Sequence, residues 1–570
     1  MVSRSSLRYG STGRLQWACQ PGGFKNSRGS DHWRASPYAW WAPGCHPSDR
    51  KAMRRHRRCA RYNSDVADLE DLVGERLMFG LPGPTLRDED VRLFKDTRAA
   101  GLILYRRNFE SPAGLLRLLE ALEGALGRRL LVATDHEGGR IVMLGGATTI
   151  FPDNLAVGAA GEATFAHRQG LVEARELRRL GVDLNLAPVL DVLTERYSPN
   201  IGIRSYGKDP ATVARCGVTR IRGMKRGGLS ACAKHFPGKG HAPLDAHLAL
   251  PTIDSTWAEM HATHLPPFLE AIAAGVDCVM TSHPVYPNLD PARVPATFSR
   301  PIVEDCLRNQ LGFGGVIASD DLEMGAIGER SPVGEAAVRA AQAGHDLLLA
   351  CHTEAAQRAV AAALLDAYRA NRLPRRGLEA AAERVRRLRE ERGARFEGGP
   401  PARDLDGPPL ASAIAARAVT SVTAGHGDFR RALNGRVSVV FPRFSELAPR
   451  ITIEPEVADE RLYLEGAFAP AGIAPEVVLV GIEPTADEIG VAAARAAAAD
   501  ATVLFLYDAH LLASNRALLE AVGTRARALA VVLLRDPYDA ALLAPGVLGI
   551  TAYGFRRCQL DAVIARLAYP

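Results

Sequence analysis

The chain has 570 residues, 47% of them hydrophobic, and a formal net charge of +6. This length exceeds what one compact core needs, so we expect two domains, or one large domain with additions. No apolar run approaches the roughly 18 residues of a membrane span, and the start of the chain lacks the apolar core of a secretory signal. We therefore expect a cytoplasmic protein with no membrane partner.

Positive charge is concentrated in residues 1–62, which hold 13 Lys or Arg against two acidic residues. The remaining chain is mildly acidic, with 57 basic and 62 acidic residues. The leader has neither helical nor strand periodicity. It fits either a disordered nucleic-acid-binding tail or upstream translation from a misassigned start, with Met53 a candidate first residue. We favour the second interpretation, because its composition differs so much from the rest, and expect no nucleic-acid partner.

Eight apolar, β-rich runs alternate with segments of helical period between residues 63 and 395. The runs cover residues 77–80, 101–105, 130–134, 182–189, 230–236, 277–282, 314–319 and 345–350. Each is apolar on both faces, as a parallel sheet covered by helices requires. This pattern predicts an α/β fold of the (β/α)₈ barrel type. A doubly wound sheet is the alternative, because periodicity does not show closure.

A second α/β unit is predicted after a Gly- and Pro-rich linker at 396–410. Residues 411–570 again alternate apolar runs with Ala-rich helices, which predicts a smaller three-layer sandwich. It has no glycine fingerprint and no phosphate loop. The nine cysteines show no CxxC pair and no ligand spacing, so we expect no metal and no organic cofactor. Cys232 and Cys278 lie inside apolar runs, which predicts that both are small core residues.

Five consecutive predicted barrel strands end in ionisable groups. These groups are Asp135, His136, Glu137 and Arg140 after the third strand, Asp191 after the fourth, Lys234 and His235 at the fifth, His283 at the sixth, and Asp320 with Asp321 at the seventh. A single such Asp is usually a helix cap. Five strand ends of this kind would crowd one barrel rim, which indicates an active site.

Several long segments resemble glycoside hydrolase family 3 in the same order. They are GLILYRRNFES, ATDHEGGRI, FPDNLAVGAA, IGIRSYGKDP, KHFPGKGHAPLDAH, TSHPVYPNLDPARVPATFS and GGVIASDDLEMGAI. The resemblance covers about residues 65–375. The D-x-H loop after KHFPG is typical of the family's bacterial β-N-acetylglucosaminidase branch. Asp245 and His247 match that loop, whereas the family's glucosidases generally take the acid/base carboxylate from outside the barrel.

The resemblance implies a role for each matching residue. Asp320 would be the nucleophile that forms a covalent glycosyl-enzyme, and strand alternation should turn Asp321 away to cap or pair nearby. His247 would be the general acid/base with Asp245 as its partner, and an imidazole titrates near neutral pH without heavy tuning. The ligands of the sugar hydroxyls would be Asp135, Arg204, Lys234 and His235. A structural ion-pair network is the alternative for these four.

Two positions depart from the family pattern, because His241 stands where Asp is usual and Ala246 where Ser is common. These two departures bear on how the loop is ordered and not on the type of reaction. The resemblance implies a retaining exo-β-N-acetylglucosaminidase acting on terminal β-GlcNAc, of the cell-wall muropeptide or chitooligosaccharide type. A β-N-acetylglucosaminide phosphorylase and a sugar-binding pseudoenzyme stay open as alternatives. The oligomeric state is not predicted.

Overall fold

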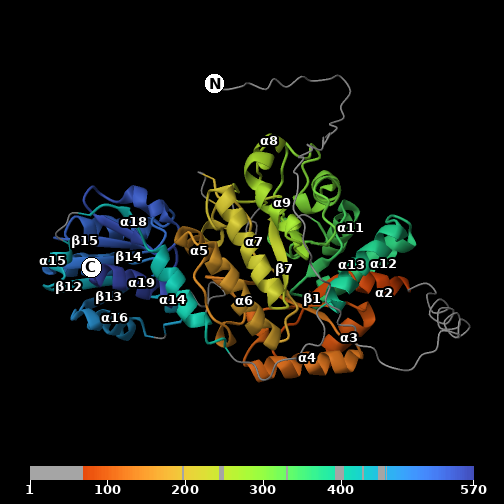
Figure 1. Ribbon diagram of the computed structural model, residues 1–570, viewed down its shortest axis with the longest axis horizontal. Coiled ribbons are helices and arrows are strands. Elements are labelled where there is room, and N and C mark those ends of the chain that lie inside the picture. The colour runs from red at the N-terminus through yellow and green to blue at the C-terminus, as the bar shows by residue number, and fades with distance from the viewer. Residues whose placement is uncertain are drawn as a thin grey trace, which may run out of the picture. The chain divides into compact units, whose positions relative to one another are not determined.

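The computed structural model describes residues 68–194, 198–242, 250–328, 331–391, 403–425, 429–446, 456–457 and 459–569. Two large sheets organise these residues, one of eight strands and one of six. The eight-stranded sheet lies in the orange-to-green half of the chain and the six-stranded sheet in the blue half (Figure 1). No helix among these residues is long and apolar enough to cross a bilayer.

The first sheet is a parallel barrel. Its strands pair in the order β10-β1-β2-β3-β6-β7-β8-β9. The strands are β1 Leu77–Gly80, β2 Gly101–Leu104, β3 Leu131–Thr134, β6 Leu184–Asn185, β7 Ser230–Phe236, β8 Cys278–Thr281, β9 Val316–Ala318 and β10 Leu348–Ala350. A parallel bridge between Ala318 and Leu347 joins the two outer strands and closes the ring. The predicted barrel is confirmed, and the doubly wound alternative is wrong.

Strand alternation builds two apolar layers around this ring. Met78, Ile103 and Leu184 fill the inside together with Cys232 and Cys278, which confirms the prediction that these two cysteines are core residues. The alternate positions face outward into the core beneath the helices, which includes Phe79 and Leu104. A barrel filled by its own side chains has no pore, so its chemistry has to lie at the ends of the strands.

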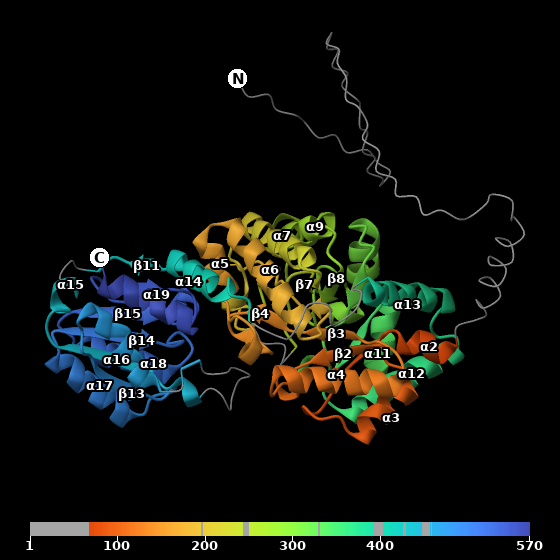
Figure 2. The ribbon, with the colours of Figure 1, turned by 60° about the horizontal axis from the view of Figure 1, so that its bottom comes forward.

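Helices cover the outside of the barrel (Figures 1 and 2). The α-helices are α2 Leu69–Gly74, α3 Asp88–Thr97, α4 Pro112–Leu126, α5 Asn154–Ala160, α6 Ala163–Arg179, α7 Pro210–Arg226, α8 Trp257–Glu259, α9 Pro266–Ala273, α10 Gly325–Gly328, α11 Val333–Ala343, α12 Glu354–Arg369 and α13 Arg375–Glu390. Two π-helical segments, Met260–His264 and Pro301–Gln310, complete the set. Short 3-10 turns lie at Arg106–Asn108, Gly145–Ala147, Gly202–Arg204 and Ala296–Phe298. The first and last helices flank the barrel's amino end.

The second sheet has the order β11-β16-β15-β14-β12-β13, with only β11 antiparallel. Its strands are β11 Thr420–Thr423, β12 Val437–Pro442, β13 Glu476–Val480, β14 Ala501–Leu506, β15 Leu529–Leu533 and β16 Leu548–Thr551. Its helices are α14 Gly407–Ala418, α15 Phe429–Ala432, α16 Glu460–Phe468, α17 Ala486–Ala498, α18 Ala513–Gly523 and α19 Arg557–Ala568, with 3-10 turns at Phe444–Glu446, Ala469–Ala471 and Pro537–Leu542.

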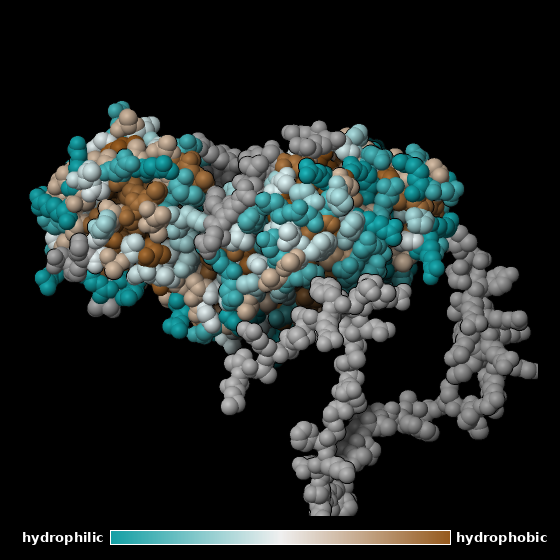
Figure 3. Space-filling model, turned by 90° about the horizontal axis from the view of Figure 1, so that it is seen from above, coloured by the Kyte–Doolittle hydropathy of each residue, from teal (hydrophilic) through white to brown (hydrophobic). Residues whose placement is uncertain are grey.

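Alternation along β14 shows that this unit has three layers. Val503 and Phe505 pack with α16 and α19 on one face, whereas Leu504 and Leu506 pack with α17 and α18 on the other. The predicted sandwich is thus confirmed. Hydrophilic residues cover most of the face seen in Figure 3, with hydrophobic residues in smaller groups. Helix α14 begins at Gly407, inside the predicted linker, and adds Leu410 and Ile414 to the core outside the barrel strands.

Candidate active site

The carboxyl end of the barrel gathers the predicted site residues. Asp135 follows β3, and a short ribbon of β4 His136–Gly138 and β5 Ile141–Val142 continues from it. Lys234 and His235 belong to β7, Arg204 ends the turn Gly202–Arg204, and Asp320 follows β9. The carboxyl ends of parallel strands meet at one rim, so segments far apart in the sequence meet there.

Lys234 is the centre of the buried charge at this rim. Its Nζ lies 2.5 Å from Asp135 Oδ1 and 2.6 Å from Glu137 Oε1, and its side chain is 3% exposed. Burial opposes a charged lysine, but the two carboxylates outweigh it and raise the pKa of Lys234. Lys234 therefore stays protonated and fixes both carboxylates. For Asp135, burial dominates and raises its pKa above the ordinary value despite Lys234.

Arg204 is held by the same glutamate. Its Nε and Nη2 each donate to a different oxygen of Glu137 at 2.8 Å, and its Nη1 donates to the Asn200 carbonyl at 2.8 Å. Burial would raise the pKa of Glu137, but Arg204 and Lys234 overcome it and lower the pKa below the ordinary value. A bidentate ion pair of this kind fixes the plane of the guanidinium as well as its position.

Glu137 is a strand-end group in the sequence, but the sequence assigns it no role. The sequence feature that could have identified Glu137 is its position two residues after Asp135, because residues two apart on an extended segment point to the same side. The structure brings the four predicted ligands together, and Glu137 is the residue that joins two of them. The set of sugar ligands predicted from the sequence therefore omits Glu137, which connects Lys234 to Arg204.

His235 is oriented by a buried carboxylate. Its Nδ1 lies 2.7 Å from Asp191 Oδ2, and the other oxygen of Asp191 accepts a hydrogen bond from the Lys239 backbone N–H at 2.7 Å. Burial raises the pKa of Asp191 to about 6, although Lys239 and Arg204 oppose that shift. The pair fixes which edge of the imidazole faces the site, and His235 Nε2 lies 3.4 Å from Arg204 Nη2.

Asp320 lies at the rim with no arginine or lysine hydrogen bonded to it among the described residues. Lys239 Nζ is 4.0 Å from Asp320 Oδ2, and the Asp321 backbone N–H donates to Oδ1 at 3.0 Å. Burial would raise the pKa of Asp320, but Lys239, His283 and Lys234 together lower it. Asp320 is therefore ionised and keeps one oxygen available for chemistry. The sequence indicates Lys239 only as a loop lysine.

Asp321 points away from this group, as strand alternation predicts. Its Oδ1 accepts hydrogen bonds from the backbone N–H groups of Cys351 and Glu323, both at 3.2 Å. Its Oδ2 lies 3.0 Å from His352 Nε2. The expected capping and pairing role of Asp321 is confirmed, so only Asp320 of the two is presented to the rim.

His283 supports the segment that carries Asp320. Its Nδ1 lies 2.7 Å from Thr297 Oγ1 and its Nε2 lies 2.9 Å from the Asp321 carbonyl. Nε2 therefore carries the proton, because a carbonyl only accepts. Burial lowers the pKa of His283, so the neutral ring holds the backbone between the two aspartates.

Asp245 and His247 lie outside the described residues, as does Ala246. The described part of their loop reaches Ala242 and resumes at Leu250. Gly238 has φ +118°, and a Cβ on Gly240 would lie 1.9 Å from the Val192 carbonyl oxygen. Both positions therefore require glycine, and they fix Lys239 between them.

His241 occupies one of the two departures from the family pattern. Its Nδ1 lies 2.7 Å from Thr194 Oγ1, and its Nε2 lies 3.7 Å from Asp254 Oδ1. The histidine is thus tied to segments on both sides of the loop. An aspartate at this position would meet Asp254 with like charge, which gives the substitution a physical reason.

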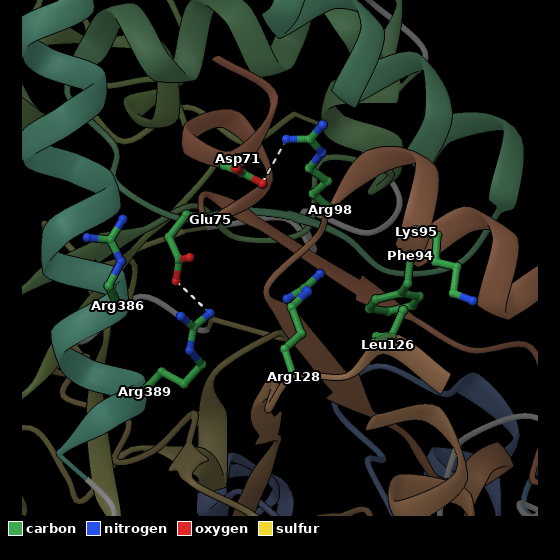
Figure 4. A pocket seen from close by; sticks show the side chains of 9 residues that line it. All are labelled: Asp71, Glu75, Phe94, Lys95, Arg98, Leu126, Arg128, Arg386 and Arg389. Carbon is green, nitrogen blue, oxygen red and sulfur yellow. Dashed lines mark ion pairs between the residues drawn. The ribbon is translucent and has the colours of Figure 1, made fainter. Parts of the chain in front are cut away.

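A charged cavity lies at the opposite, amino end of the strands. It has a volume of about 450 Å³ and is lined by Asp71, Glu75, Phe94, Lys95, Arg98, Leu126, Arg128, Arg386 and Arg389 (Figure 4). Glu75 pairs there with Arg389 at 2.6 Å, and Asp71 with Arg98 at 2.8 Å. None of the predicted site residues contributes to it.

The rim can hold a polyhydroxylated ring next to an ionised carboxylate. Lys234, Arg204 and His235 supply donors, and Asp135, which is 20% exposed, supplies an acceptor. Asp320 supplies negative charge at one side of the space they surround. No group of three or more metal-ligating side chains occurs in the described part of the chain. The arrangement suits a reaction that develops positive charge on a bound sugar.

Comparison with known proteins agrees with this chemistry. Residues 67–388 match the glycosyl hydrolase family 3 N terminal domain. A β-hexosaminidase from Tolumonas auensis is 39% identical over 293 residues, which are 51% of this chain and 85% of that protein. A β-N-acetylhexosaminidase from Beutenbergia cavernae is 31% identical with a TM-score of 0.53, covering 57% of this chain and all of that one.

Solved structures also match over most of the chain. A glycoside hydrolase family 3 β-N-acetylglucosaminidase from Paenibacillus sp. is 32% identical and has a TM-score of 0.82. The match covers 88% of this chain and 97% of that chain. The similarity therefore extends beyond the barrel into the C-terminal sandwich.

Proposed function

Because the chain belongs to glycosyl hydrolase family 3, we propose that it is a retaining exo-β-N-acetylglucosaminidase that removes terminal β-GlcNAc. The observation that carries this proposal is the rim itself. There Lys234 joins Asp135 to Glu137, Glu137 holds Arg204, and the ionised Asp320 stands beside them. The enzyme is a glycoside hydrolase. The residues of the rim offer a physical basis for the substrate and the catalytic steps proposed here.

Asp320 is proposed as the nucleophile. Attack by one of its oxygens on the anomeric carbon forms a glycosyl ester and expels the aglycone oxygen. The geometry supports this role, because the other oxygen is occupied by the Asp321 N–H and the lowered pKa of Asp320 keeps the group ionised. Lys239 at 4.0 Å is close enough to hold the charge without forming a tight pair that would block attack.

His247, with Asp245, is proposed as the general acid/base. The leaving oxygen needs a proton in the first step, and water must lose one in the second. The support for both residues is the D-x-H motif of the sequence, at the spacing of the family's β-N-acetylglucosaminidase branch. The described N-terminal part of this loop lies beside the site, because Lys239 faces Asp320.

The proposed −1 subsite consists of Asp135, Arg204, Lys234 and His235. Charged hydrogen bonds from these groups would hold the hydroxyls of the terminal sugar. Each bond to a charged group contributes about 1.5–3 kcal/mol. Glu137 does not face the sugar in this proposal, since both of its oxygens are already bound by Arg204 and Lys234.

The test of this function compares two chromogenic substrates. We expect aryl β-GlcNAc to be cleaved with a kcat/KM at least about 100-fold above that of aryl β-glucoside, because a site built to bind a polar substituent rejects an analogue that lacks it. Equal rates on the two substrates would contradict the proposal, and preference for the glucoside would point to the family's glucosidase branch.

Phosphorolysis is the alternative outcome at the same site. A histidine acid/base would repel an incoming phosphate less than a glutamate would, so phosphate could replace water in the second step. We propose hydrolysis, because Lys239, the one cation of the described part of the loop, faces Asp320. Reactions with and without millimolar phosphate should both yield free GlcNAc, and predominance of GlcNAc-1-phosphate would make the enzyme a transferase.

The natural substrate is proposed to be a cell-wall muropeptide with a GlcNAc–anhydro-MurNAc unit, as the family resemblance implies. Chitooligosaccharides are the competing class. Comparing kcat/KM for a muropeptide and for chitobiose distinguishes the two, and a preference for chitobiose would overturn the cell-wall assignment.

A further inference from the structure

The ion pair of Glu137 and Arg204 rests on two short backbone segments of the barrel rim. Glu137 belongs to β4, which pairs with the two-residue strand β5, and Arg204 ends the turn Gly202–Arg204. Both segments lie outside the eight-stranded sheet. The position of the pair therefore depends on the groups that pack against these two segments.

The first segment is hydrogen bonded to the C-terminal sandwich. Arg556, which precedes α19, is buried, and its Nε donates to the Gly139 carbonyl at 2.6 Å. Gly139 lies two residues beyond Glu137. A hydrogen bond from a charged donor is roughly twice as strong as one between neutral groups. The sandwich thereby holds the end of the strand that carries Glu137.

Close packing reinforces this hydrogen bond. A Cβ on Gly139 would lie 2.0 Å from Asp153 Oδ1, and a Cβ on Gly554 of the sandwich would lie 2.5 Å from Asp153 Oδ2. Asp153 is 2% exposed, and its Oδ1 accepts a hydrogen bond from the Arg140 backbone N–H at 3.0 Å. The segment after Glu137 is therefore packed against Asp153, which in turn contacts the sandwich.

The second segment contacts a carboxylate of the sandwich. Asp536 follows β15, and a Cβ on Gly202 would lie 2.6 Å from both of its carboxylate oxygens. Gly202 has φ +43° and lies two residues before Arg204. Asp536 is 2% exposed, and neither oxygen has a hydrogen-bond partner among the residues that the structure describes. A buried carboxylate left in this way is costly, so a functional constraint is expected at this position.

We propose that the C-terminal sandwich positions the −1 subsite, with Arg556 holding the segment of Glu137 and Asp536 supporting the turn of Arg204. Both act through the pair of Glu137 and Arg204, so they are positioning residues and not catalytic ones. A displacement of Arg204 by about 1 Å would misplace its donors relative to the sugar, which can lower the rate about 100-fold. This inference rests on the proposed function, which assigns Arg204 to the sugar.

The first test uses the full chain with aryl β-GlcNAc as substrate. Arg556→Met keeps the length of the side chain but removes the hydrogen bond to Gly139, so kcat/KM should fall about tenfold or more. Arg556→Lys restores a charged donor and should fall between wild type and Arg556→Met. Unchanged kcat/KM in Arg556→Met would overturn the inference.

Asp536→Ala should separate activity from stability. It removes a buried carboxylate that makes no hydrogen bond within the described ranges, and Arg535 keeps Asp508 as an ion-pair partner. The melting temperature should therefore not fall. kcat/KM should still fall about tenfold, because the turn of Arg204 loses its support. A lower melting temperature with unchanged kcat/KM would mean that Asp536 only stabilises the fold, against the proposal.

Arg76→Met is the matched control. Arg76 is 2% exposed, and its Nε donates to the Asp346 carbonyl at 3.2 Å, but it lies at the amino end of the barrel. Its loss should lower the melting temperature and leave kcat/KM unchanged. An equal fall in kcat/KM in this variant would refute the inference, because it would trace the loss to stability and not to position. Arg175→Gln, which breaks the 3.2 Å ion pair with Asp404, serves as control if Arg76→Met does not fold.

A double-mutant cycle tests whether Arg556 acts through the pair. Arg204→Lys keeps the positive charge but loses the bidentate contact with Glu137. Arg556→Met should therefore lower kcat/KM by a smaller factor in Arg204→Lys than in wild type, since the pair that it positions is already broken. The same factor in both backgrounds would contradict the proposal.

Hydrogen exchange separates this inference from the proposed function, because it needs no turnover. Mass spectrometry should show faster exchange of backbone N–H groups in residues 136–142 for Arg556→Met and in residues 200–206 for Asp536→Ala, because each segment loses a contact that holds it. If the wild-type chain cleaves neither aryl β-GlcNAc nor aryl β-glucoside, the proposed function fails, and the exchange measurement still decides the positioning. Equal exchange in wild type and both variants would overturn it.

Discussion

Each end of the barrel holds a glutamate in a close ion pair, but the two glutamates have opposite pKa shifts. At the carboxyl end, Glu137 lies 2.6 Å from Lys234, and at the amino end Glu75 lies 2.6 Å from Arg389 (Figure 4). The pKa of Glu137 is lowered, because Arg204 and Lys234 overcome burial. The pKa of Glu75 is raised, because burial outweighs Arg389 and its neighbours.

This difference separates the cluster proposed as the catalytic site from the cluster at the amino end. Both clusters contain arginine, lysine and carboxylates, so composition alone does not separate them. At the carboxyl end, strand ends from distant segments converge, and Glu137 is contacted by both Arg204 and Lys234. Glu75 at the amino end has one close ion pair among the described residues, with Arg389. Direct contact with Arg204 and Lys234 keeps Glu137 ionised, and Lys239, His283 and Lys234 do the same for Asp320, as chemistry on a developing cation requires.

The largest effect is expected from Asp320→Asn. The amide cannot attack the anomeric carbon, so kcat should fall by at least about 1,000-fold, in line with the loss of a nucleophile in other enzymes. Steady-state kinetics on aryl β-GlcNAc measures this loss. Asp321→Asn is the neighbouring control and should retain activity within about tenfold, at some cost in stability through lost backbone caps. Comparable losses in the two variants would remove the basis for assigning Asp320.

A matched pair of substitutions tests the comparison of the two ends directly. Glu137→Gln leaves Arg204 and Lys234 short of a buried partner and should lower the free energy of unfolding by about 3–5 kcal/mol. Glu75→Gln should change it by about 1 kcal/mol or less, since its side chain is more exposed and its charged form is disfavoured. Urea unfolding at neutral pH measures both.

The pH dependence of that pair has a fixed sign. Because the folded-state pKa of Glu137 lies below the ordinary 4.5, its stabilising contribution is present above 4.5 and is lost as the pH falls toward the lowered value. The deficit of Glu137→Gln should therefore shrink in acid. A deficit that grew in acid would contradict the electrostatic role given to Arg204 and Lys234.

Asp191 is expected to show the opposite dependence. Its pKa is raised from 3.8 to about 6, so the folded state binds more protons between these values and stability falls as the pH rises through this window. Asp191→Asn removes this titration. The stability of wild type relative to the variant should therefore drop by up to about 3 kcal/mol from pH 4 to pH 7. A flat difference would show that burial does not shift Asp191.

Two glycine substitutions should have smaller effects than the loss of Glu137. Gly240→Ala would place a Cβ 1.9 Å from the Val192 carbonyl and displace the segment of Lys239, at a cost of about 1–3 kcal/mol and with reduced activity. Gly124→Ala in α4 meets no atom within 4 Å and should stabilise the fold by about 0.5–1 kcal/mol without affecting activity. Thermal unfolding measures the stability of both variants, and turnover of aryl β-GlcNAc measures their activity. A Gly240→Ala variant as active and stable as wild type would contradict the close contact.

Much of this architecture could be predicted from the sequence. All eight barrel strands fall within the predicted apolar runs, because a strand buried on both faces leaves a continuous apolar signal. The ionisable residues that follow those runs in the sequence include most of the residues found at the carboxyl-end rim. Asp321 was assigned correctly because side chains alternate along a strand.

The rest depended on contacts between distant segments. Nothing in the sequence states that Glu137 joins Lys234 to Arg204, or that Lys239 rather than an arginine faces Asp320. The edge strand β11 and the β4–β5 ribbon were also missed, because β11 is a partly exposed TSVT segment and β4 has the sequence HEG, so neither lies in a continuous apolar run. The contact between Gly202 and Asp536 joins residues more than 300 positions apart, which periodicity does not show.

The central claim, that the carboxyl-end rim is the catalytic site with Asp320 as nucleophile, is tested most directly by trapping the covalent intermediate. A fluorinated GlcNAc donor that forms the glycosyl-enzyme faster than it is hydrolysed would be incubated with the full chain, and the labelled peptide would be sequenced by mass spectrometry. We expect one sugar per chain on Asp320, and none in Asp320→Asn. A label on another residue, or turnover of the donor with no label on Asp320, would contradict the claim.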